Sequence, residues 1–122
     1  MATVLIVDDQ EIAREALQGF FNAKGATCLA AANSDEALKA LTERQPDLVL
    51  LDIKLDGSRL DGLGILQEAG KLPNRAKMKI VMVTGFPDPD IEAKAKAMGA
   101  DDFLVKPVAL DKLVELYKEV GG

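Results

Sequence analysis

Five short apolar runs recur along the chain, and longer stretches with a helical period of apolar residues separate them. The runs are rich in Val, Ile and Leu and are almost unbroken by polar residues, as expected of strands buried on both faces. They cover residues 3–8, 27–31, 48–52, 79–84 and 102–105. We therefore predict a parallel sheet that is covered on both sides.

Each apolar run is followed by a segment with the pattern of an amphipathic helix. The predicted helices cover residues 11–24, 34–44, 62–72, 89–98 and 109–120. Asn33 or Ser34 can cap the second helix, and Pro89 lies in the first turn of the fourth. Strand–helix alternation with short connections predicts right-handed crossovers and a three-layer α/β sandwich. Five strands favour the flavodoxin-like order 2-1-3-4-5, with five helices around the sheet.

The length of 122 residues predicts one domain, residues 1–122, with enough chain for a hydrophobic core. An apolar share of 48% and a charged share of 29% are typical of a globular protein in water. No apolar run could cross a bilayer and no basic signal segment opens the chain, so we expect a cytoplasmic protein without membrane contact. Cys28 lies in an apolar stretch and is expected to be a small buried residue rather than a redox group.

The charge balance limits the classes of partner and chemistry. A net charge of −5 argues against direct nucleic-acid binding. One basic cluster, Lys71, Arg75, Lys77 and Lys79, lies in a segment with Pro and Asn and is expected to be a solvated loop. The chain has no histidine, so any phosphohistidine in its chemistry must belong to a partner.

Polar residues occupy the carboxyl ends of the predicted strands, where open parallel sheets bind ligands. Asp8 and Asp9 close the first strand, Asp52 the third, Thr84 the fourth, and Lys106 follows the fifth. In the predicted order these strands are neighbours. Three carboxylates, a hydroxyl and an ammonium should therefore converge on one edge.

These groups suit phosphoryl transfer when they act together. Three close carboxylates repel one another unless a cation joins them, and Mg²⁺ prefers a few carboxylate oxygens with water and phosphate. Asp52 is a suitable nucleophile for an acyl phosphate, Lys106 a point charge for a phosphoryl oxygen, and Thr84 a hydroxyl donor. Phosphoryl transfer needs mainly positioning and charge neutralisation. Taken singly, Thr84 would be an ordinary strand residue and Lys106 a loop lysine, so the hypothesis depends on the whole set.

Five motifs, in this order and at these spacings, resemble the receiver domains of two-component response regulators, of the kind found in chemotaxis regulators. They are VLIVDDQ (4–10), DLVLLDI (47–53), DGL (61–63), VMVTG (81–85) and MGADDFLVKP (98–107). The resemblance spans essentially the whole chain. It implies that Asp52 is the phosphoacceptor and that Asp8 and Asp9 hold Mg²⁺, with the backbone carbonyl of Lys54 as a further ligand.

The resemblance also implies the switching residues. Lys106 is expected to bind the phosphoryl group, and Thr84 to move onto a phosphoryl oxygen after transfer. Phe103 resembles the aromatic whose inward or outward rotamer reports the state. The Lys106–Pro107 bond is expected to be cis.

Partners follow from the same resemblance. The donor is expected to be a sensor histidine kinase or a phosphotransfer protein. A downstream protein target would bind the surface of the fourth helix, fifth strand and fifth helix, residues 89–118. The sequence does not decide whether phosphorylation makes the chain form a homodimer. The chain would assist the transfer of the phosphoryl group to itself and the slow loss of that group. It would not be a multiple-turnover enzyme on other substrates.

The segment after Asp52 departs from the family pattern. It reads DIKLDGSRLDG, with Asp56 where a proline is usual and a loop about two residues longer. Asp56 and Asp61 would add negative charge if they lay near the site, but as loop residues they are expected to be solvated. Lys54 and Phe86 lie two residues beyond Asp52 and Thr84, at the two positions through which the family tunes the lifetime of the phosphoryl group. A lysine and a bulky phenylalanine there would shield the acyl phosphate from water or steer its approach, so the resemblance implies slowed self-dephosphorylation.

Three other functions compete. A non-phosphorylated interaction module on the same fold would lack an acidic residue, the threonine or the lysine, and none is missing here. A nucleotide- or flavin-binding protein would need a phosphate loop, and GLGILQ (62–67) lacks the third glycine. An aspartyl-phosphate phosphatase would need Asp-x-Asp, where the chain has Asp8-Asp9-Gln10.

Overall fold

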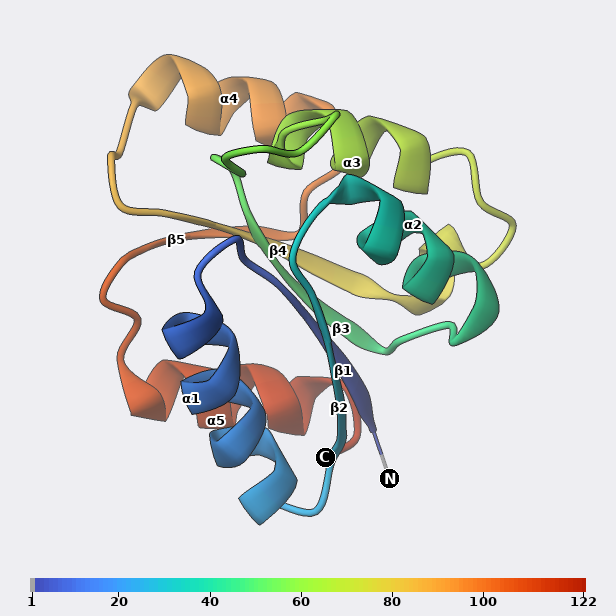
Figure 1. The fold of residues 1–122 in the computed structure, drawn as a ribbon, viewed down its shortest axis with the longest axis vertical. Helices are drawn as coiled ribbons and strands as arrows, with labels where there is room; N and C mark the ends of the chain where they lie inside the picture. The colour runs from blue at the N-terminus through green and yellow to red at the C-terminus, as the bar shows by residue number, and fades with distance from the viewer. Residues whose placement is uncertain (1) are drawn as a thin grey trace.

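A computed structural model describes residues 2–122, in which strands and helices alternate from β1 to α5 (Figure 1). The strands are β1 (Thr3–Val7), β2 (Thr27–Ala31), β3 (Leu48–Asp52), β4 (Lys79–Thr84) and β5 (Asp102–Val105). The helices are α1 (Glu11–Ala23), α2 (Ser34–Glu43), α3 (Gly62–Ala69), α4 (Pro89–Ala97) and α5 (Leu110–Glu119). A short 3-10 helix, Arg75–Lys77, precedes β4.

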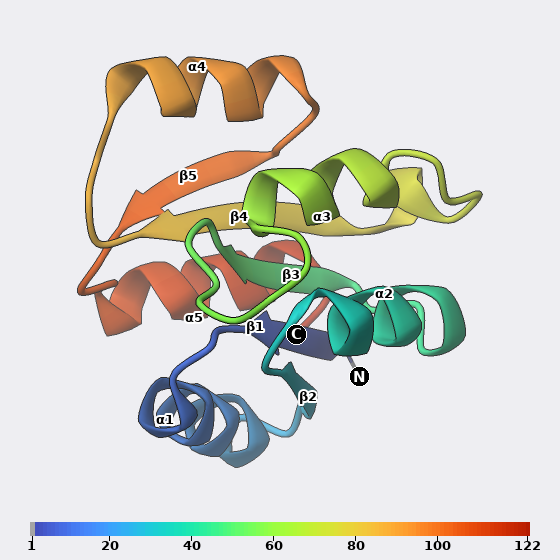
Figure 2. The same ribbon diagram turned by 45° about the horizontal axis from the view of Figure 1, so that its top comes forward.

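The five strands form one parallel sheet of order β2-β1-β3-β4-β5, which confirms the predicted topology. Figure 2 lets the reader follow this order from β5 to β2 across the twisted sheet. The order reverses direction at β1, whose neighbours are β2 and β3. Such a reversal opens a crevice at the carboxyl ends of the strands.

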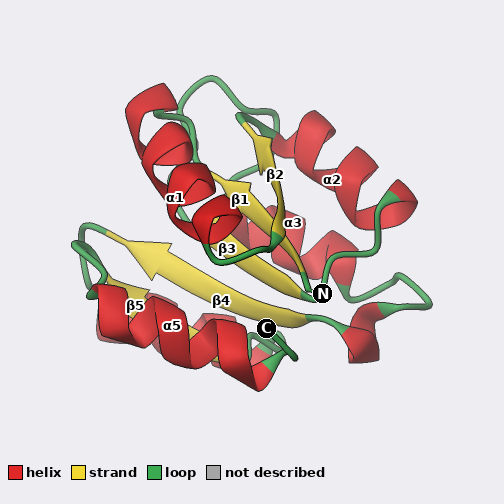
Figure 3. Cartoon of the chain, turned by 90° about the horizontal axis from the view of Figure 1, so that it is seen from below, coloured by secondary structure: helices red, strands yellow, loops and turns green. Residues whose placement is uncertain are grey.

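Alternate strand residues point to opposite faces, and each face has its own core. One core joins the sheet to α2, α3 and α4 through residues such as Leu41, Ile65 and Ala95. The other joins the sheet to α1 and α5 through Phe21 and Leu116, among others. Figure 3 shows the two helix layers on either side of the sheet. Cover on both faces explains why the strands contain almost no polar residues.

Most element boundaries agree with the predictions to within one residue, and α3 is the exception. The pattern predicted a helix to residue 72, whereas α3 ends at Ala69. The amides of Lys71 and Leu72 bond to carbonyls three residues earlier, so the last turn tightens and leaves the α-helical ladder. Asn33 rather than Ser34 is the N-cap of α2, and its side chain accepts the Glu36 amide.

The basic segment before β4 is not a solvated loop throughout, so that prediction was wrong for two residues. Arg75 donates to the carbonyls of Met78 and Gly99 and pairs with Asp101. Lys79 begins β4 and pairs with Glu119. Arginine's planar fork can satisfy several acceptors at once, which is how it joins the segment to the turn before β5.

Cys28 is buried in the α1/α5 core, as predicted. Burial raises the pKa of its thiol to about 11, so the reactive thiolate is scarce at neutral pH. Within residues 2–122, no helix has the length and apolar character to cross a bilayer.

Candidate functional site

Strand register brings the predicted site residues to one edge of the sheet. Val7 pairs with Leu51, which sets Asp8 beside Asp52 one residue further along. Asp52 in turn pairs with Val83, the residue before Thr84. Thr84 pairs with Val105, the residue before Lys106. The convergence predicted from the strand ends is therefore present.

Asp8 is held rigidly at the end of β1. Its amide donates to the Ala31 carbonyl, which continues the pairing with β2 beyond the last strand residue. Its carboxylate accepts the Gln10 amide at 2.9 Å, and Arg14 donates to its backbone carbonyl. Only 3% of Asp8 is exposed, so its charged carboxylate needs the Gln10 amide and a cation.

Lys106 supplies that cation. Its Nζ lies 2.8 Å from Asp52 Oδ2 and 3.0 Å from Asp8 Oδ2. Its amide donates to the Thr84 carbonyl at 2.7 Å, which fixes the start of the chain after β5. The Lys106–Pro107 peptide is cis, as the family resemblance implied.

Burial dominates the electrostatics of Asp52, which is 7% exposed. Burial raises the pKa of its carboxyl, Lys106 lowers it by hydrogen bond and charge, and Asp8 raises it further, so the pKa is raised overall. At Lys106, partial burial by itself lowers the pKa. The hydrogen bonds and charges of Asp52 and Asp8 outweigh that effect and raise it. The Lys106 ammonium thus stays charged, but its contacts with Asp52 do not fully offset the cost of burying the Asp52 carboxylate.

The raised pKa of Asp52 predicts how the stability of the metal-free protein depends on pH. Because the pKa of Asp52 is raised by folding, the folded chain keeps a proton that the unfolded chain releases. The free energy of unfolding therefore falls as pH rises from the ordinary carboxyl pKa through the raised one. Asp52→Asn removes this charge and leaves Lys106 paired with Asp8, so it should be more stable than the parent at neutral pH. The two proteins should converge in acid.

Thermal unfolding in a chelator, from acid to neutral pH, measures this difference. A parent protein that is the more stable of the two at neutral pH would contradict the prediction.

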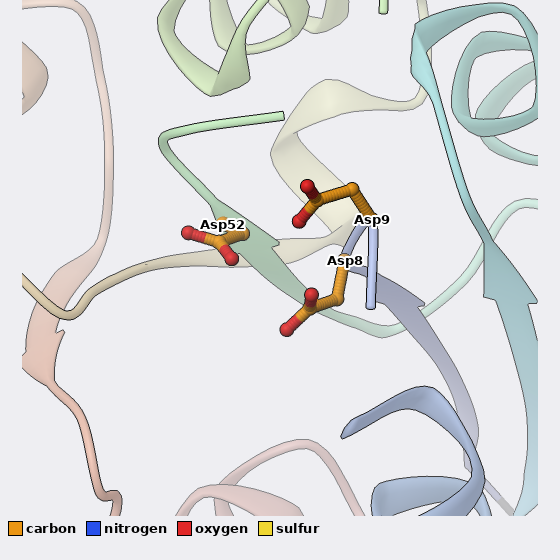
Figure 4. Close-up of side chains that lie close together, drawn as sticks. All are labelled: Asp8, Asp9 and Asp52. Carbon is orange, nitrogen blue, oxygen red and sulfur yellow. The ribbon is translucent and has the colours of Figure 1, made fainter. Parts of the chain in front are cut away.

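The three carboxylates form a group that fits a divalent cation. One oxygen each of Asp8, Asp9 and Asp52 lies within 4.8 Å of the others. Figure 4 shows their side chains gathered at the ends of β1 and β3. An all-oxygen donor set of this kind is the chemistry that Mg²⁺ prefers. The backbone amide of Lys54 bonds to Asp52 and lowers its pKa, while the predicted role of the Lys54 carbonyl stays a prediction.

Thr84 and Phe103, the two predicted switch residues, lie on β4 and β5. The Thr84 hydroxyl accepts the Phe86 amide at 3.1 Å and donates to the Phe86 carbonyl at 3.3 Å. It therefore holds the first turn of the β4–α4 connection. Phe103 is half-buried and packs on the α2/α3/α4 core, in register with Met82. Its predicted rotamer change stays a prediction.

Two hollows flank Asp52 and Lys106, and their linings differ. The larger, about 480 Å³, lies towards α1 and α5 and is mostly apolar, with Leu17 and Leu113 in its wall. The smaller, about 260 Å³, contains Asp9, Thr84 and Phe86 as well. The smaller hollow is the better reaction space, because it brings together the Asp9 and Asp52 carboxylates, the hydroxyl and the ammonium, whereas Asp8 lines the larger one.

Sequence reasoning missed how the loop after β3 takes part in the site. Asp61 is not simply solvated: its side chain caps α3 by accepting the Gly64 amide. The exposed Asp56 contributes through its backbone, whose amide donates to Asp9 Oδ2 at 3.2 Å. An Asp before a Gly that opens an apolar helix could have indicated the cap. No local pattern indicates a backbone amide directed at a residue 47 positions away.

Comparisons with known proteins agree with this geometry. The sequence profile of the response regulator receiver domain matches residues 4–118. An NtrX-like response regulator of Rickettsia bellii is 41% identical over 94% of this chain, and the chain spans 24% of that relative's length. Sporulation initiation phosphotransferase F of Bacillus subtilis is 34% identical over 95% of this chain and 90% of its own length.

Solved structures give the same result. The receiver domain of NtrX from Brucella abortus is 36% identical, with a TM-score of 0.85 and coverage of 96% of both chains. The chemotaxis protein CheY4 of Vibrio cholerae is 26% identical, with a TM-score of 0.89 and coverage of 98% of both chains. The chain therefore belongs to the response regulator receiver domains of two-component signalling systems.

Proposed function

We propose that the chain is a phosphoacceptor signalling domain in which Asp52 takes a phosphoryl group with the help of Mg²⁺. The observation that carries the proposal is the contact of Lys106 with both Asp8 and Asp52, beside a third carboxylate. These groups are held by four neighbouring strands, so the site is positioned before any donor arrives.

In the proposed reaction an Asp52 oxygen forms a bond to phosphorus while the bond from phosphorus to the donor's imidazole nitrogen breaks. That nitrogen keeps the electron pair. Mg²⁺ bound by Asp8, Asp9 and Asp52 would supply charge neutralisation for the phosphoryl oxygens. Lys106 would exchange its bond to Asp52 for one to a phosphoryl oxygen. Asp52 must be ionised to attack, and a cation counters the burial that raises its pKa.

Phosphorylation would also alter the Thr84 contacts. A phosphoryl oxygen on Asp52 competes with the Phe86 backbone for the Thr84 hydroxyl. Loss of that bond would release the connection between β4 and α4. We propose that this change, with a rotation of the Phe103 ring, shifts the face formed by α4, β5 and α5, residues 89–118.

Receiver domains accept phosphoryl groups from histidine kinases or phosphotransfer proteins, and we propose one of these as the donor. The downstream target would be a protein that binds residues 89–118. We further propose that the chain turns over no other substrate. Lys54 and Phe86 line the smaller hollow, and this position beside Asp52 supports the prediction of slow self-dephosphorylation.

Treatment with acetyl phosphate and Mg²⁺, followed by intact mass measurement, tests the proposal. One phosphoryl group should add, only with Mg²⁺, and Asp52→Asn should abolish the addition. Asp111→Asn is a matched control, because Asp111 is an exposed carboxylate in the first turn of α5, outside both hollows, and its loss should not affect uptake. A parent that gains no phosphoryl group would favour a non-phosphorylated interaction module instead.

A further inference from the structure

The loop between β3 and α3 contains a tight turn at residues 55–58. The Ser58 amide donates to the Leu55 carbonyl at 3.3 Å, and Gly57 has a φ of +76°. Glycine adopts this left-handed conformation without the steric penalty that a Cβ would bring. The turn is therefore a defined structure rather than slack added by the longer loop.

Two anchors fasten this turn to the rest of the molecule. The Leu55 side chain is buried in the α2/α3/α4 core. The Ser58 hydroxyl accepts the Ser34 amide at 2.8 Å, and the Ser34 hydroxyl accepts the Leu60 amide at 3.1 Å. Ser34 is the first residue of α2 and is fully buried, so its amide has no partner within the helix. Ser58 supplies that partner from 24 residues away.

The anchored turn directs one backbone amide at the acidic group. Asp56 is the residue after Leu55, and its N–H donates to Asp9 Oδ2 at 3.2 Å. Asp9 is less buried than Asp8, and its amide-bound oxygen has a set direction. Groups that orient a metal ligand in this way typically change metal affinity about 10–100-fold when they are removed.

We propose that Ser58 is a positioning residue for the cation site: its hydroxyl fastens turn 55–58 to the start of α2 and so holds the Asp56 amide against Asp9. The inference rests on the proposed function, since it concerns the Mg²⁺ of that reaction. It connects α2, which contributes no side chain to the acidic group, to the binding of the cation.

Two substitutions at Ser58 give side chains of the same shape and so separate the effect of the hydroxyl from the effect of side-chain size. Ser58→Thr keeps the hydroxyl, and Ser58→Val removes it. Mg²⁺ titrations of the unphosphorylated protein, followed by the amide resonances of Asp9 and Asp56, measure the affinity. We expect the valine variant to bind Mg²⁺ about 10-fold more weakly than the threonine variant. Without metal, its Asp56 amide should lose the hydrogen-bonded shift.

Arg59→Ala is the matched control in the same loop. Arg59 also joins the loop to α2, through Asp35, but both side chains are largely exposed, and such pairs contribute little. Its Mg²⁺ affinity should equal that of the parent. If melting curves show that valine does not fit at position 58, Ser58→Ala replaces it in the comparison.

Equal Mg²⁺ affinities for the valine and threonine variants, with an unchanged Asp56 amide, would overturn the inference alone, provided that the parent binds Mg²⁺ and becomes phosphorylated. A parent that binds no Mg²⁺ would overturn the cation part of the proposed function and this inference with it. If the valine variant binds Mg²⁺ more weakly while its melting temperature stays close to that of the threonine variant, the result would support a positioning role for Ser58 over a general loss of structure.

Discussion

Lys106→Met should slow phosphoryl uptake by Asp52 about 10²–10³-fold, the usual effect of removing one preorganised charge partner from a reacting oxygen. Methionine keeps much of the length of the lysine side chain and removes the ammonium that lies 2.8 Å from Asp52 Oδ2. The rate of mass gain with acetyl phosphate and Mg²⁺ measures this effect. Lys112→Met is the matched control: its side chain is as exposed as that of Lys106, and it pairs with Asp102 and Glu115 outside the acidic group.

The same substitution should destabilise the metal-free fold. Asp8 and Asp52 would lose their shared cation while both stay buried. Removing one partner of a fully buried ion pair costs about 3–5 kcal/mol. Because a third of the Lys106 side chain is exposed, water screens the pair, and we expect roughly 1–3 kcal/mol at neutral pH.

Metal and acid should each reduce this loss of stability. Mg²⁺ would replace the missing positive charge between the carboxylates, and in acid the raised pKa of Asp52 lets the carboxyl take a proton. Urea unfolding of parent and variant, with and without Mg²⁺, measures the difference. A gap in unfolding free energy that Mg²⁺ leaves unchanged would argue against a cation at these carboxylates.

Gly62→Ala should be among the most destabilising substitutions in the chain, by about 3 kcal/mol or more. A Cβ at Gly62 would lie 2.2 Å from the Asp52 carbonyl oxygen and 2.7 Å from Ile53 Cα. Both are backbone atoms at the end of β3, and the Gly62 amide bonds to the Ile53 carbonyl at 2.7 Å. To relieve the clash, α3 would have to move away from the end of β3.

Gly19→Ala provides the control, because no described heavy atom beyond its chain neighbours and the backbone of its own helix lies within 4 Å of a Cβ there. Gly19 lies inside α1, where alanine should stabilise the helix by about 0.5–1 kcal/mol. The urea concentration at the midpoint of unfolding should therefore fall for Gly62→Ala and rise for Gly19→Ala. A Gly62→Ala protein with parental stability would show that the α3 start can shift freely. The close approach of two backbones is the physical reason for the glycine of the DGL motif.

Most of the fold could be predicted from the sequence because its signals are local. Unbroken Val, Ile and Leu runs indicated strands covered on both faces, and four of the five strands begin and end as predicted. Helical periodicity and end residues such as Pro89 located the helices. The site followed from one general rule: polar groups at the carboxyl ends of neighbouring parallel strands meet at one edge. Asp8, Asp52, Thr84 and Lys106 do so through strand register alone.

Only the tertiary structure decided the contacts that join distant segments. Arg75 reaches the turn before β5, Ser58 completes the start of α2, and the Asp56 amide meets Asp9 across 47 positions. Hydrophobic periodicity states which face of an element is buried, but not which backbone amide lacks a partner or which side chain can reach it. Those pairings depend on distances between elements after packing, and the need to satisfy each buried polar group selects them.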